Sequence, residues 1–193
     1  MPQIFDDEGR ERVRSLLIEN GFKSIKAYGL KKTSIAEVAA RSGIATGTFY
    51  NFFKNKEEFV YQIMLYKREE SRRKLDELTK KGKIDRAGFK AFLESVFFED
   101  NNIFKYIDER EIAQLRARWP EEYWKNNSND NSTLTHVIGN LKYPRKDLDL
   151  KVLANLMKSM VLIDHGREQL YEEVCPESMD IFIDAIVRYV FGK

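Results

Sequence analysis

The sequence predicts an all-α protein, for three reasons. The 193 residues include only four prolines and ten glycines, which leaves room for long uninterrupted helices. Several segments repeat apolar residues every three or four positions, whereas no run alternates apolar and polar residues as a half-buried strand does. Hydrophobic residues make up 42% of the chain, which is enough for a substantial core. We therefore expect about nine helices and no sheet.

The first helix is expected to run to about Asn20 and to end at Gly21. Its inner face would consist of apolar residues at helical spacing: Phe5, Val13, Leu16 and Leu17. Residues 1–56 carry ten Lys and Arg against six Asp and Glu, and the remaining residues carry 23 against 25. This basic N-terminal part suits an anionic partner, although ordinary solvated helix faces are the alternative explanation.

Two short helical patterns follow within residues 33–58. The first begins at an N-cap, either Thr33 or Ser34, and Glu37 lies three residues after the serine as its capping-box partner. Its apolar face has the spacing i, i+3, i+4 and consists of Ile35, Val38 and Ala39. A three-residue turn, 42–44, then ends this helix, and Gly43 can adopt the left-handed conformation there at little cost.

The second short helix has two distinct faces. Its aromatic face points toward a core and consists of Phe49, Phe52 and Phe53. Its polar face consists of Thr46, Thr48 and Asn51. Two helices joined by so short a turn form a helix-turn-helix motif, here residues 33–53, whose second helix can lie in the major groove of DNA.

The run T-S-I-x-x-V-A-x-x-S-G-I-x-x-G-T-F-Y-x-x-F-x-x-K-E-E-F closely resembles the DNA-binding motif of the TetR family of bacterial transcriptional regulators. This resemblance implies an N-terminal three-helix helix-turn-helix domain over residues 1–56. It also implies a helical ligand-binding and dimerisation domain over residues 57–193, with residues 57–81 as a connecting helix. By the same resemblance, the basic residues Arg10, Arg12 and Arg14 of the first helix can approach phosphates.

The resemblance also implies roles for residues of the motif. Tyr50 and Lys56 would contact the DNA backbone, and the helix N-terminus at Thr33 and Ser34 offers hydroxyls and amides to a phosphate. Thr46, Thr48 and Asn51 are the candidates for base edges, and Gly47 would let the backbone approach DNA closely. The family often has serine where this chain has Ala45, so either Thr46 caps the second helix or that end is looser. The full expected set is Thr33, Ser34, Ala45, Thr46, Gly47, Thr48, Tyr50, Asn51, Lys54 and Lys56.

Further helices are expected along the rest of the chain. One spans about 55–81, and the next is capped by Asp85 and carries the apolar residues from Phe89 to Phe97. The others span about 103–119, 133–141, 148–164 and 177–191. The polar run 126–132 is a loop by composition. The basic cluster Arg72, Arg73 and Lys74 is expected to form an exposed helix face.

The last two helices have wider apolar arcs than a surface helix needs, which predicts self-association. The expected homodimer interface consists of Leu153, Met160, Met179, Phe182, Ile183, Ile186, Val187 and Val190. The alternative is that both helices lie at the centre of a monomer.

Aromatic side chains are frequent in the second domain, and together with the resemblance they predict an apolar effector cavity. The candidate residues are Phe92, Phe97, Phe104, Trp119, Tyr123, Trp124, His136 and Met157. His136 or Tyr123 would supply a polar contact. Each of these side chains could instead belong to the core.

No catalytic constellation is present, and we expect no enzyme activity, no cofactor and no metal site. The two histidines lie in different segments, and Cys175 alone can form neither an intrachain disulfide nor a thiolate zinc site. The acidic N-terminus is not that of a signal peptide, and no apolar run spans a membrane, so we expect a cytoplasmic protein.

The predicted function is a homodimeric repressor that binds a palindromic operator in double-stranded DNA and is released by a small hydrophobic effector. One alternative is a DNA-binding architectural or cell-structure protein of the same fold without an effector. Another is a helical ligand-binding protein whose helix-turn-helix has lost its DNA function.

Overall fold

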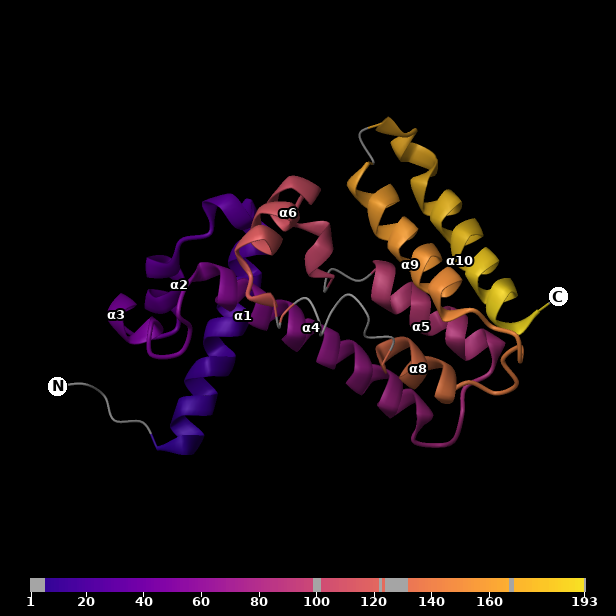
Figure 1. Cartoon of the computed structure of the whole chain (residues 1–193), viewed down its shortest axis with the longest axis horizontal. Helices are drawn as coiled ribbons and strands as arrows, with labels where there is room; N and C mark the ends of the chain where they lie inside the picture. The colour runs from indigo at the N-terminus through magenta and orange to yellow at the C-terminus, as the bar shows by residue number, and fades with distance from the viewer. Residues whose placement is uncertain (1–5, 99–101, 122, 124–131, 167–168, 193) are drawn as a thin grey trace. The chain divides into compact units, whose positions relative to one another are not determined.

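The computed structural model describes the whole chain except residues 1–5, 99–101, 122, 124–131, 167–168 and 193 (Figure 1). The described residues form nine α-helices, two short 3-10 helices and no strand, so the all-α prediction is confirmed. None of these helices is long and apolar enough to cross a membrane.

Packing divides the chain into two compact units, which we call the head and the body. The head comprises residues 1–68 and 106–124, and the body comprises residues 69–105 and 125–193. Residues 106–124 thus pack with the N-terminal helices, although they follow the connecting helix in sequence. The functional boundary expected after residue 56 stays a prediction.

In the head, α1 spans Asp7–Lys32 and is longer than expected. The predicted end at Gly21 is wrong, because the helix continues and is instead kinked at Gly29, where φ is 77°. Gly21 is buried, and a Cβ atom there would lie 2.3 Å from Cζ of Phe59. The glycine therefore allows α1 and α4 to pack closely rather than ending a helix.

The inner face of α1 also differs from the prediction by one position. Leu17 and Ile18 are buried, whereas Leu16 is exposed and Val13 is half-buried. Phe5 lies outside the described residues.

The connecting helix α4 spans Lys56–Thr79, and its first residue, Lys56, is hydrogen-bonded to the end of α1. Nζ of Lys56 donates hydrogen bonds to the carbonyl oxygens of Leu30 at 2.8 Å and of Thr33 at 2.7 Å. Burial lowers the pKa of Lys56, while the nearby carboxylates of Glu111 and Glu57 act in the opposite direction. Lys56 thus holds the end of α1 and the start of the helix-turn-helix against α4.

Residues 103–119 do not form the single helix that periodicity predicted. A 3-10 turn, Ile103–Lys105, is followed by α6, Glu109–Arg118. Asp108 and Glu111 begin α6 with a reciprocal capping box. At its other end, Nε1 of Trp119 donates to the carbonyl oxygen of Glu57 at 3.0 Å.

The body contains α5 (Arg86–Phe98), α8 (Ser132–Gly139), α9 (Leu150–His165) and α10 (Cys175–Phe191), with a 3-10 turn at Glu172–Val174 (Figure 1). Asp85 caps α5 as predicted, since its carboxylate accepts the N–H of Gly88 at 3.0 Å. The aromatic face of α5 enters one core with α9 and α10, and Leu75 of α4 joins it, whereas Leu78 is exposed.

Seven of the eight predicted interface residues lie inside this core. They are Leu153, Met160, Met179, Ile183, Ile186, Val187 and Val190, each at most 5% exposed. Phe182 is half-buried against the same core. The prediction left these seven side chains to a dimer partner, but they are buried within the chain itself, because α5 covers the apolar arc that the sequence left without a partner.

Replacing Lys56 with methionine should destabilise the head. The change removes two charge-assisted hydrogen bonds from a half-buried group, and we expect a loss of about 1–3 kcal/mol in the free energy of unfolding. Urea unfolding measures this as a lower midpoint at unchanged slope. Lys54→Met is the matched control, since Lys54 is exposed, and its effect should stay within about 0.5 kcal/mol. Equal midpoints for the two variants would contradict the role of Lys56 as a tether.

Candidate nucleic-acid interface

The helix-turn-helix forms as its local sequence predicts. α2 spans Ile35–Arg41, and Ser34, not Thr33, is its N-cap, with Oγ accepting the N–H of Glu37 at 3.5 Å. Gly43 has a φ of 74°, which confirms the left-handed turn. Asn20 of α1 donates to Oγ of Ser42 at 3.0 Å, and this bond fixes the turn to α1.

The recognition helix α3, Thr46–Phe49, has only four residues and is held by aromatic packing. Phe49, Phe53 and Phe59 form a buried cluster whose ring centroids lie 4.8–5.3 Å apart. Phe59 belongs to α4, so the cluster joins α3 to the connecting helix. So short a helix is not stable alone, and its orientation depends on these rings.

The opposite face of α3 is open to solvent. Thr46, Gly47 and Asn51 are exposed, and Tyr50 is 53% exposed, whereas Thr48 is half-buried. A Cβ atom at Gly47 would meet no atom within 4 Å, so a polymer backbone can approach there. Ala45 occupies the N-cap position without a side-chain hydrogen bond, and Thr46 does not replace it. Of the two alternatives for this helix end, the structure therefore has the looser one.

Two residues predicted to contact phosphates have other partners. Thr33 is buried, and its hydroxyl donates to the carbonyl oxygen of Gly29 at 2.8 Å, so this hydroxyl is not exposed to a ligand. Lys56 uses two of its three N–H groups on backbone carbonyls. Its contact with DNA stays a prediction that only the third N–H can satisfy. By contrast, the side chain of Lys54 is exposed two residues earlier.

Two arginines of α1 bind neighbouring elements of the head, one at the end of the recognition segment and one on α4. Nη2 of Arg10 donates to the carbonyl oxygen of Asn51 at 2.9 Å, and its guanidinium lies 5.0 Å from the centroid of the Phe52 ring. Nη2 of Arg14 donates to Oε1 of Gln62 at 2.7 Å. The sequence indicated basic residues here, but it could not indicate that they bind protein carbonyl and amide oxygens. Arg12 forms only an exposed pair with Glu8.

The predicted effector residues divide between the two units. Trp119 and Tyr123 belong to the head, where the rings of Tyr123 and Tyr61 are stacked with their centroids 3.9 Å apart. Phe92 and Phe97 lie in the body core, and Met157 packs against that core. The side chain of Phe104 and the whole of Trp124 lie outside the described residues.

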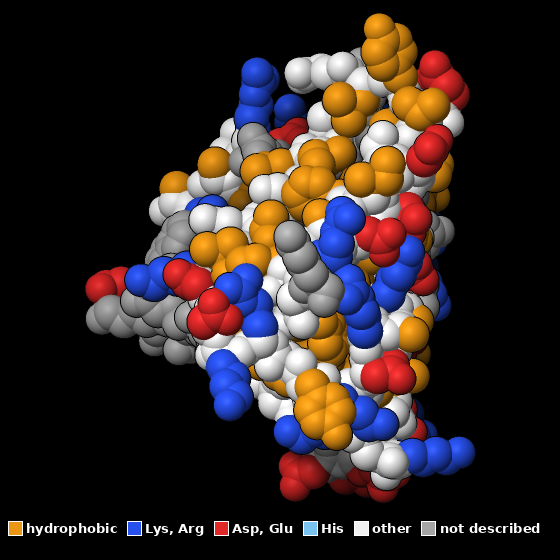
Figure 2. Space-filling view, turned by 90° about the vertical axis from the view of Figure 1, so that its right-hand side faces the viewer, with side chains coloured by type: hydrophobic (Ala, Val, Ile, Leu, Met, Phe, Trp, Pro, Cys, Tyr) orange, Lys and Arg blue, Asp and Glu red, His pale blue; other side chains and the backbone are white. Residues whose placement is uncertain are grey.

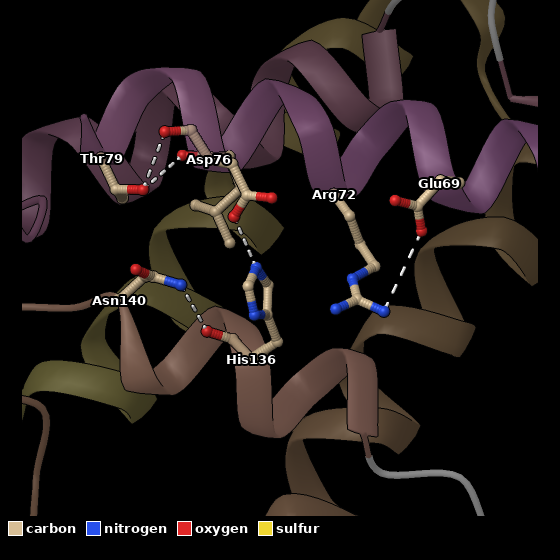
Figure 3. A network of polar contacts seen from close by, with 7 residues as sticks. Glu69, Arg72, Asp76, Thr79, His136 and Asn140 are labelled. Atoms are coloured by element: carbon tan, nitrogen blue, oxygen red, sulfur yellow. Dashed lines mark hydrogen bonds and ion pairs between the residues drawn. The ribbon is translucent and has the colours of Figure 1, made fainter.

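His136 of α8 takes part in a polar network with α4 (Figure 3). Its Nε2 lies 2.7 Å from Oδ1 of Asp76, and Asn140 donates to its carbonyl oxygen at 2.9 Å. Arg72 extends from the same helix as Asp76, and Nε of Arg72 is buried with no hydrogen-bond partner in the part of the chain that the structure describes. Arg72 was expected on an exposed face and is half-buried instead. An unpaired N–H of this kind can donate to an oxygen of a ligand.

Residues 17–63, which contain α2, α3 and the start of α4, match the family described as "Bacterial regulatory proteins, tetR family". An uncharacterized HTH-type transcriptional regulator of Bacillus subtilis, YhgD, is 38% identical over 64 residues. That alignment spans about a third of each chain, 33% of this one and 34% of YhgD.

Solved structures resemble the chain over nearly its whole length. A TetR family transcription regulator from Marinobacter aquaeolei has a TM-score of 0.61 at 18% identity, over 96% of this chain and 98% of its own. FadR from Bacillus subtilis, solved with stearoyl-CoA, has a TM-score of 0.56 at 18% identity, over 93% and 98%. At such identities the likeness concerns the fold. The match over residues 17–63 and the related regulator identify the helix-turn-helix part of the chain as that of the TetR family of bacterial regulatory proteins, and the solved structures show that the whole chain shares the fold of such regulators.

Proposed function

We propose that this protein is a transcriptional regulator that binds double-stranded DNA through α3. The observation that carries the proposal is the open surface formed by Thr46 and Gly47 of α3 and by Asn51 just after it, on a segment whose opposite side is fixed by buried phenylalanines. Tyr50 and Lys54 flank this face and contact phosphates, while Ser34 presents the start of α2. The protein acts in the cytoplasm and has no catalytic role, and the described residues contain no cluster of side chains suited to a metal.

The regulator acts as a homodimer through the outer sides of α9 and α10. Since their inner sides fill the core, the contact uses exposed apolar residues such as Leu162 and Ile181, which are 53% and 59% exposed. Hydrophobic side chains gather among charged ones on the face seen in Figure 2, which is the side that carries α10 in Figure 1. Two heads then enter successive major grooves of a palindromic operator, about 34–36 Å apart.

We assign the protein the role of a repressor that a small hydrophobic effector releases. A dimer bound to the operator prevents other proteins from binding there. A ligand in the body lowers the affinity for the operator only if it binds the conformation that is unsuited to DNA more tightly than the conformation that binds DNA. The structure of FadR with stearoyl-CoA supports an acyl-type effector for a protein of this fold. In this chain, the unpaired Nε of Arg72 supports an effector that also carries an oxygen acceptor.

The DNA proposal predicts different effects for Lys54 and Asn51. Lys54→Ala should weaken binding to all sequences alike and reduce the slope of log K against log salt by about one, because it removes one phosphate contact. Asn51→Ala should instead change preference at particular base pairs by about 1–3 kcal/mol. Fluorescence anisotropy with DNA from upstream of the chain's own gene, at several salt concentrations, measures both. Unchanged affinity in both variants would remove α3 as the DNA-reading element.

The interface proposal predicts that Ile181→Glu gives monomers. By the two-fold symmetry both copies carry the new carboxylate, and we expect dimerisation to weaken at least about 30-fold, since like charges facing across an interface cost several kcal/mol. Sedimentation velocity measures the change. Leu78→Glu is the control, because Leu78 is similarly exposed but lies on α4. A dimer that Ile181→Glu leaves intact rules out this face.

The effector proposal predicts that decanoate, a hydrophobic carboxylate, releases the protein from DNA. Arg72→Met should raise the decanoate concentration needed for release at least about tenfold, because it removes a charge-assisted hydrogen bond. Arg73→Met is the matched control, because Arg73 is exposed on the same helix. Gel shifts on the upstream DNA provide the measurement. Equal sensitivity of the two variants would contradict the role of Arg72.

A further inference from the structure

The head contains a surface cleft on residues that the DNA-reading face does not use. It has a volume of about 460 Å³ and lies among the end of α1, the start of α4 and one side of α6. Its apolar part consists of Leu30 and Leu115, both buried in the chain. The remaining lining is strongly polar and carries both charges, so the contacts of each charged group decide what the cleft can bind.

The three carboxylates at this cleft are all engaged by the protein itself. Oε1 of Glu57 accepts a hydrogen bond from Arg118 at 2.8 Å, and this contact lowers the pKa of Glu57. Oδ1 of Asp108 accepts the N–H of Glu111 at 2.7 Å, and Oε1 of Glu111 accepts the N–H of Lys31 at 3.1 Å. Because these acids already have donors, they are poor candidates for binding a cation.

The basic groups are only partly engaged. Lys56 donates to backbone carbonyls, and Arg118 pairs with Glu57. In contrast, the ammonium of Lys31, the guanidinium of Arg110 and the amide of Gln114 have no hydrogen bond or ion pair within the described residues. All three line the cleft, so its free hydrogen-bonding capacity consists of donors, two of them cationic.

We infer that this cleft binds a small organic anion, a carboxylate or phosphate attached to a short apolar group. Lys31 and Arg110 hold the anionic oxygens from opposite elements, α1 and α6. The apolar group of the ligand lies against Leu30 and Leu115. The volume falls within the range of about 300–1,000 Å³ that is typical of small-molecule sites.

A molecule bound there joins two elements of the head that are distant in sequence. It contacts α6 and also residues 30–31, which lead directly into Thr33 and the Ser34 cap of α2. The ligand therefore adds to the existing contact between Glu111 and the N–H of Lys31. Because it binds the folded head, it also raises the unfolding temperature in proportion to its occupancy.

Isothermal titration calorimetry on the full chain tests the inference, with sodium benzoate and inorganic phosphate as separate probes and sodium chloride at matched ionic strength as the reference. We expect at least one probe to bind. The double variant Lys31→Gln, Arg110→Gln should bind that probe at least about tenfold more weakly, because it lacks two charge-assisted contacts. Benzoate binding alone indicates a carboxylate ligand, and phosphate binding alone indicates a phosphorylated one.

The matched control is Lys32→Gln with Arg116→Gln, which removes the same charges from exposed neighbours that do not line the cleft. It should change the affinity less than about twofold. Binding of neither probe, or equal losses in the two double variants, overturns the inference. If the first double variant does not fold, methyl resonances of Leu30 and Leu115 in the unmodified chain decide, since whichever probe binds in the cleft must shift them. No DNA is present, so the result is independent of the proposed regulatory function.

Discussion

The DNA-reading part of this protein depends on the packing of three phenylalanine rings. A helix of four residues has too few internal hydrogen bonds to persist in water, so α3 exists because Phe49 and Phe53 are buried against Phe59 of α4. The same ring of Phe59 lies over Gly21, where a methyl group would not fit. α1, α3 and α4 are therefore positioned by one close contact, and the open face of α3 is its consequence.

Polar tethers complete this arrangement around the apolar contact. Lys56 binds the carbonyls that end α1, Arg10 binds the carbonyl of Asn51, and Ser34 and Ser42 order the ends of α2. Each tether adds a side-chain hydrogen bond to a backbone group at or near a helix end. Charged residues that the family resemblance assigns to phosphates thus have structural partners in this chain. In the proposed function, the contact with DNA is therefore assigned to side chains that remain exposed, such as Lys54.

The body follows the same principle on a larger scale. α9 and α10 are apolar around most of their circumference, but α5 and Leu75 of α4 bury their inner sides in one core. Only the outer residues, such as Leu162 and Ile181, remain for a partner. α6 likewise packs with the head through Trp119 and Glu111, although its sequence position suggests the body. The cleft between α6 and α1 exists only because of this placement.

The sequence predicted the helical class, the helix-turn-helix with a cap at Thr33 or Ser34 and a turn at Gly43, and the cap at Asp85, because helical spacing, caps and short turns depend on residues that are close together in the chain. It misplaced the end of α1, treated residues 103–119 as one helix and left core residues of α10 to a dimer partner. Those outcomes depend on which distant element covers each face, as Phe59 covers Gly21 and α5 covers Ile183. Helical periodicity indicates that a face is buried, but it does not indicate which element buries it. The covering element follows from packing between segments that are distant in sequence, so it is known only from the tertiary structure.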